Sequence, residues 1–164
     1  MPPDEAGEAL WRFALALYAR PGVAAALLAL QDRGGQNVTL ILFALWLGAV
    51  IGKRLDPGGV AAARGAAAPL DAVVRELRRL RRALKPDPAP DSQRLRRSIA
   101  AIELAAERRV LARLAAEAGA MPDEAEADRL ALAAGNLALC LGPASGSEDA
   151  GRLRAAVAAL LRRA

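Results

Sequence analysis

Histidine is absent from the 164 residues of this chain, and cysteine occurs only once, as Cys140. The absence of histidine removes the commonest general base and the usual metal ligand. A single cysteine forms neither an intrachain disulfide nor a thiolate cluster, and the apolar neighbours of Cys140 favour a buried residue over a nucleophile. We therefore expect no catalytic residue, no metal site and no cofactor, and a reducing, cytoplasmic location.

Long hydrophobic runs are also missing. The most apolar run, residues 38–51, is shorter than the roughly 20 residues needed to cross a bilayer. It predicts a central helix that is buried on all sides, and no transmembrane segment. Residues 1–9 are acidic where a signal peptide would be basic, so no signal peptide is expected.

What the chain has in abundance is alanine, leucine and arginine, which favour helix over strand and are typical of a GC-rich bacterial genome. Apolar residues recur at helical spacing between breaks at glycine, proline and asparagine. The pattern predicts an all-α fold, a single-domain bundle (1–164) of six to seven helices with a buried central third helix. Pro21 is expected to open the second helix, Asn37 to cap the third, and Pro122 to begin the sixth.

Three parts of the chain differ in composition. All five aromatic residues lie within the first 46 residues, so we expect residues 1–55 to form an aromatic-rich three-helix core. Residues 56–69, rich in glycine and alanine between prolines, read as a connector that is partly helical at most. Residues 70–164 predict long amphipathic helices, which either wrap around the core or form a long antiparallel hairpin.

Positive charge gathers in the middle of the chain. Residues 53–117 carry fifteen basic and eight acidic side chains, and the predicted helix 70–85 presents a basic face, namely Arg75, Arg78, Arg79, Arg82 and Lys85. One interpretation is a surface for nucleic acid or an anionic membrane. The favoured interpretation is the solvated side of a core helix, because no aromatic residue that could stack on bases lies nearby.

Two apolar helices are separated by a polar cluster: Gln31, Asp32, Arg33, Gln36 and Asn37. It could form the rim of a pocket for a small molecule or lipid, lined by the aromatic residues Trp11, Tyr18, Phe43 and Trp46. The favoured interpretation is local, with Asn37 capping a helix and Asp32 paired with an arginine such as Arg20.

Glu103 and Glu107 lie one helical turn apart, a spacing that suits metal binding or acid–base chemistry. In a chain without histidine, ion pairing with Arg96, Arg108 or Arg113 is the favoured interpretation.

The N-terminal third carries a distinctive pattern: LWRFALALY at 10–18, PGV at 21–23, LALQD at 28–32 and NVTLILFALWL at 37–47. This pattern resembles a family of small all-helical bacterial proteins catalogued as a domain of unknown function. The resemblance implies an all-helical cytoplasmic protein and supplies no activity, substrate or catalytic residue.

These observations favour a non-enzymatic interaction or adaptor protein of the bacterial cytosol, with a protein partner that the sequence does not identify. Homo-oligomerisation is an open alternative. A small-molecule or lipid-binding bundle is the second hypothesis, and association with nucleic acid or a membrane surface through the basic helix is the third. An enzyme that uses only carboxylates and arginines is the least favoured.

Overall fold

The computed structural model describes residues 2–124 and 128–162, which form an all-α single-domain fold. Seven α-helices follow one another in this part of the chain: α1 (Pro3–Tyr18), α2 (Val23–Gly34), α3 (Val38–Trp46), α4 (Pro57–Ala83), α5 (Pro90–Glu117), α6 (Arg129–Leu141) and α7 (Glu148–Leu161). A π-helical turn, η1 (Leu47–Ile51), extends α3, and two short 3₁₀ turns follow α5 and α6. The predicted fold class is confirmed.

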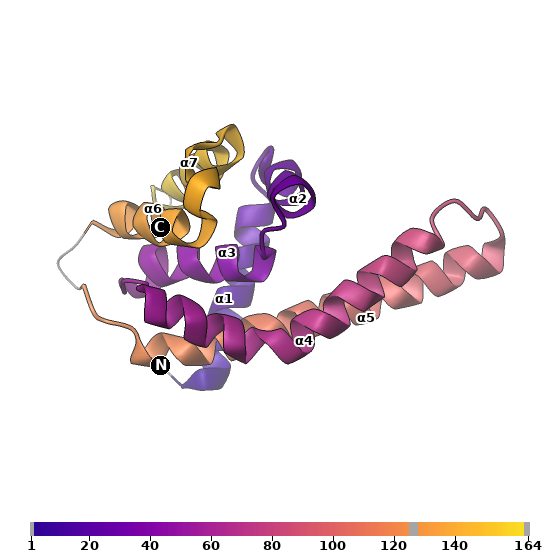
Figure 1. The fold of residues 1–164 in the computed structure, drawn as a ribbon, viewed down its shortest axis with the longest axis horizontal. Coiled ribbons are helices and arrows are strands. Elements are labelled where there is room, and N and C mark those ends of the chain that lie inside the picture. Colours follow the sequence, from indigo (N-terminus) through magenta and orange to yellow (C-terminus); the bar gives the residue numbers. More distant parts are fainter. Residues whose placement is uncertain (1, 125–127, 163–164) are drawn as a thin grey trace.

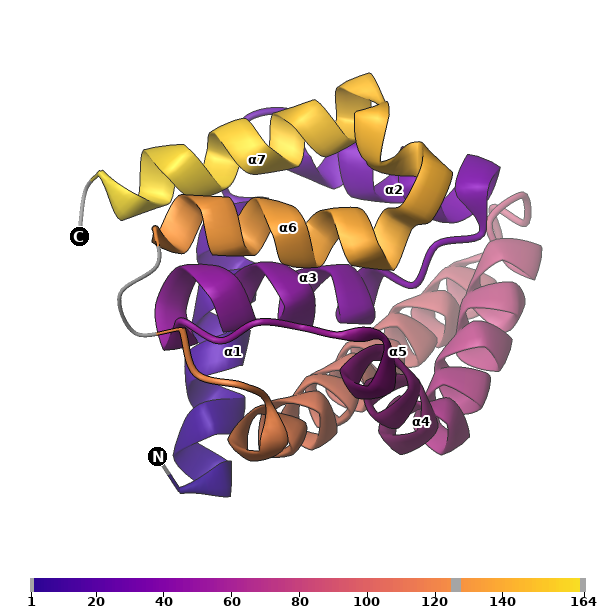
Figure 2. The same ribbon diagram turned by 60° about the vertical axis from the view of Figure 1, so that its left-hand side comes forward.

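Helix α3 forms the centre of the molecule. Figure 2 shows α6 in front of α3, α1 crossing behind it, and α2 and α7 on one side. All residues from Thr39 to Trp46 are buried, as expected for a helix without a polar face. Gly48 brings this region very close to α6, because a Cβ atom there would overlap the backbone of Ala133. We call the part formed by α1, α2, α3, α6 and α7 the body.

Helices α4 and α5 form a long antiparallel hairpin (Figure 1). Its base packs against the body, where α1 runs along α5, and its far end projects away from the other helices. The hairpin was one of two arrangements predicted for the later helices, and it is the one observed. We call residues 70–105, which include the projecting part, the arm.

The predicted connector at 56–69 is wrong, because α4 already begins at Pro57 and continues through Pro69 to Ala83. Asp56 caps this helix by accepting a hydrogen bond from the backbone N–H of Gly59 at 2.6 Å. The alanine-rich stretch then continues as helix, and the small side chains of Ala63 and Ala67 are buried in the hydrophobic core. Alanine here permits close helix packing, whereas composition alone suggested a loop.

Helix boundaries elsewhere follow local capping. Asn37 caps α3 as predicted, whereas Pro21 precedes α2 by two residues because Gly22 adopts a left-handed conformation with φ of 78°. Pro122 does not begin α6. Its carbonyl accepts from the N–H of Arg54 at 3.0 Å, and α6 begins at Arg129 after an Asp128 cap.

No single described helix is long and apolar enough to cross a membrane. A stretch of α1 and α2 reaches the required length and composition only when the two helices are taken together, and they are bent by 102° relative to each other.

Candidate functional site

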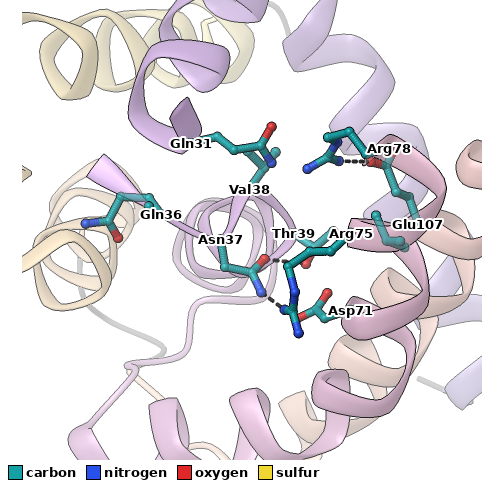
Figure 3. Close-up of a pocket in the computed structure, with 11 residues that line it drawn as sticks. Gln31, Gln36, Asn37, Val38, Thr39, Asp71, Arg75, Arg78 and Glu107 are labelled. Carbon is teal, nitrogen blue, oxygen red and sulfur yellow. Dashed lines mark hydrogen bonds and ion pairs between the residues drawn. The ribbon is translucent and has the colours of Figure 1, made fainter. Parts of the chain in front are cut away.

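A polar pocket of about 230 Å³ lies where the α2–α3 turn meets α4 and α5 (Figure 3). The turn contributes Gln31, Gln36 and Asn37 among others, and the hairpin contributes two carboxylates and two guanidinium groups: Asp71, Arg75, Arg78 and Glu107. Sequence reasoning grouped Gln31 with Asn37 and Arg75 with Arg78, but it did not place the two groups together. The structure brings them to opposite walls of one pocket.

Asn37 connects the two walls. Its Oδ1 accepts from the N–H of Leu40 at 3.2 Å and from the hydroxyl of Thr39 at 2.7 Å. Its Nδ2 donates to Oδ2 of Asp71 on α4 at 2.5 Å. The Asn37 side chain that caps α3 therefore also attaches α3 to the hairpin, and these hydrogen bonds hold it in one orientation.

An ion-pair network closes the far wall of the pocket. Arg78 donates to Oε1 of Glu103 at 3.0 Å and to Oε1 of Glu107 at 2.7 Å, and Arg81 donates to both oxygens of Glu103. Glu103 is only 5% exposed and lies between α4 and α5. Ion pairing of the two glutamates is confirmed, although their partners are on α4, and none of Arg96, Arg108 and Arg113 is among them.

The two glutamates differ in electrostatic character. At Glu103, burial opposes ionisation, but hydrogen bonds from Arg81 and Arg78 outweigh it and lower the pKa. At Glu107, burial dominates and raises the pKa despite the contact with Arg78. Tyr18 keeps 42% of its surface exposed, yet desolvation and the nearby Glu107 raise its pKa to about 12. One wall of the pocket thus contains a carboxyl group that gains a proton more readily than usual.

The predicted aromatic pocket does not form as one site. Phe43 and Trp46 are completely buried, with ring centroids 6.3 Å apart, and belong to the core of the body. Trp11 lies on α1 with the guanidinium of Arg108 5.7 Å from its ring centroid. Asp32 lies outside the polar pocket and accepts from Arg82 at 3.0 Å, where Arg20 was the predicted partner.

The predicted basic face does lie on one side of α4, but much of its charge is compensated. Arg78 binds two glutamates, Arg79 pairs with Glu76, and Arg82 pairs with Asp32. Arg75 and Lys85 have no ion pair with any residue in the described part of the chain. The side chains of this face therefore serve mainly to attach the arm to α2 of the body, through Arg82, and to join α4 to α5, through Arg78.

The opposite side of the arm carries a row of exposed aliphatic side chains. Val73 and Leu80 lie two turns apart on α4, exposed by 47% and 38%, and Leu95 and Ile102 lie two turns apart on α5, exposed by 54% and 56%. At 3.6 residues per turn, the pair on α4 lies roughly half a turn around the helix from Asp71, Arg75 and Arg78, and the pair on α5 lies roughly a third of a turn from Glu107. We call these four residues the outer face of the arm. Sequence analysis predicted long amphipathic helices over 70–164, but it did not show that part of their apolar side is exposed.

Comparison with known proteins identifies the family but no function. The profile of the family described as "Protein of unknown function (DUF2390)" matches residues 9–114. The chain belongs to this family. The matched region includes the α2–α3 turn and most of the hairpin, so both the polar pocket and the outer face fall within it. No curated protein and no solved structure matches the chain.

Proposed function

We propose that the chain is a non-enzymatic interaction protein whose arm binds the arm of a second copy. The observation that carries this proposal is the outer face. A row of leucine, isoleucine and valine side chains stands in solvent on a projecting two-helix hairpin, and apolar surfaces of this kind mark contact sites.

The geometry of the arm suits a helical partner. The two antiparallel helices of the arm bury only the side chains that lie between them. The outer-face residues recur seven positions apart on each helix, which is the spacing typical of residues inside a helical bundle. A second hairpin packed on this face completes a four-helix bundle. Because the same face serves both copies, the contact is isologous and closes as a dimer.

The distribution of charge favours a second copy over a phosphate-bearing partner. Nine basic and five acidic residues lie in 70–105, but Arg75, Arg78, Arg82 and Lys85 stand on the opposite side of α4. The outer face is flanked on α4 by Glu76, which pairs with Arg79, and on α5 by Asp91, which pairs with Arg94. A copy that approaches this face therefore meets apolar groups and internally compensated charges.

A reducing, cytoplasmic location in a bacterium is part of the proposal. It is supported by the use of cysteine, since the chain has the single Cys140, which is buried and free.

The proposal is tested by native mass spectrometry and light scattering on the purified chain over a wide range of concentration. We expect a dimer that becomes monomeric in the variants Leu80→Glu and Ile102→Glu, with unchanged circular dichroism. Leu139→Glu is the matched control, since Leu139 is 39% exposed on α6 in the body, and this variant should remain dimeric. A wild-type monomer at every concentration, or a dimer that both arm variants keep, would refute the proposal.

A further inference from the structure

The polar pocket contains side chains whose hydrogen-bonding capacity the protein itself does not use. Arg78 and Asn37 are held by partners within the network. Arg75, which is exposed to solvent, and the side-chain amide of the half-buried Gln31 make no hydrogen bond or ion pair with the residues that the structure describes, and both line the pocket. Figure 3 shows Gln31 on the opposite side of the pocket from the hairpin side chains.

The carboxylates of the pocket are also only partly used. Asp71 accepts from Asn37 through Oδ2, and Glu107 accepts from Arg78 through Oε1, which leaves the second oxygen of each without a partner in the described chain. Asp71 and Arg75 stand one turn apart on α4, yet no ion pair joins them. The pocket thus offers donors and acceptors of opposite charge side by side, on a frame fixed by Asn37 and Arg78.

We infer that this pocket binds a small zwitterion, of the class of free α-amino acids. Arg75 and Gln31 supply free donors for a carboxylate, and the open oxygens of Asp71 and Glu107 supply acceptors for an ammonium group. A simple anion would face two carboxylates, and a simple cation would face two guanidinium groups, so each is disfavoured by like charge. The volume of about 230 Å³ is smaller than the pockets that take drug-sized ligands, and it suits a molecule of this size.

The test is a titration of the ¹⁵N-labelled chain with glycine, L-alanine and L-glutamine, followed by NMR. At least one amino acid should give saturable shifts at Gln31, Asn37 and Thr39, and acetate and ethylamine, which carry only one of the two charges, should not. Arg75→Met should weaken binding by about tenfold or more, because a charge-assisted hydrogen bond is lost. Arg79→Met removes an arginine outside the pocket and serves as the control.

Three results would overturn the inference. The first is the absence of a saturable response to every amino acid, and the second is a response centred on residues outside the pocket. The third is binding of acetate or inorganic phosphate as tight as that of the amino acid, which would identify a plain anion site. None of these outcomes depends on whether the chain forms a dimer, so the proposal about the arm is tested separately.

Discussion

The body and the arm bury apolar surface in different ways. In the body, α3 is surrounded on all sides and its largest side chains, Phe43 and Trp46, are completely buried. In the arm, two helices share a single seam, and that seam contains the charged Glu103 together with Arg78 and Arg81. The difference teaches that the central helix of the body is covered on every side, whereas the arm depends on an ion-pair network and leaves its outer face uncovered.

The largest effect is expected in the body. Trp46→Ala removes the largest fully buried side chain and leaves a cavity around α3, which should lower the free energy of unfolding by about 3–5 kcal/mol. Urea denaturation followed by circular dichroism measures this loss. Leu28→Ala, at an exposed position of α2, is the control and should change stability by less than about 0.5 kcal/mol. A loss below about 1 kcal/mol for Trp46→Ala would contradict the description of a tightly packed body.

A smaller and more local effect is expected in the arm. Glu103→Gln keeps the shape of the side chain but leaves Arg81 without its counter-charge and Arg78 with Glu107 alone, which should cost about 2 kcal/mol. Hydrogen exchange followed by mass spectrometry should show faster exchange in 70–105 and little change in α3 and α6.

The matched control for this variant is Glu76→Gln, which breaks the exposed pair with Arg79 on the same helix and should leave exchange unchanged. Equal acceleration of exchange in the arm and the body of Glu103→Gln would show that the two parts unfold together, and the comparison between them would fail.

The body was predicted from the sequence more fully than the arm was. The apolar run 38–51 identified the buried helix α3, and Asn37 identified its cap, because both signals are local in the chain. The prediction of a connector at 56–69 was wrong because the signal for this helix is not local in the chain. This stretch is a helix in which the small residues Gly59, Ala63 and Ala67 are buried, and their burial cannot be read from composition.

The candidate site shows the same limit. Periodicity showed that Val73, Leu80, Leu95 and Ile102 lie on apolar stripes, but it does not say whether a stripe is covered. The apolar side of each helix is wider than the surface over which α4 and α5 contact each other. The apolar side chains outside that contact stay exposed and form the outer face. The polar pocket was missed because Asn37 and Asp71 are 34 residues apart and meet only in the folded chain.

The smallest predicted effect concerns pH, and it separates the two glutamates of the network. The pKa of Glu107 is raised above its usual 4.5 by burial, with Arg78, Glu103 and Tyr18 nearby, so ionised Glu107 costs stability above its folded pKa. The pKa of Glu103 is lowered, since the hydrogen bonds from Arg81 and Arg78 outweigh its burial. Its stabilisation is therefore present above 4.5 and is lost as the pH falls through the folded value.

On acidification from neutral pH, the arm should first gain a little stability as Glu107 takes up its proton, and then lose stability as Glu103 does. Hydrogen exchange of 70–105, corrected for the intrinsic dependence of exchange on pH, measures both phases. Glu107→Gln should remove the first phase and Glu103→Gln the second, while α3 follows neither. If Glu103→Gln still shows the full loss of arm stability below 4.5, another carboxylate is responsible and Glu103 does not hold the arm together.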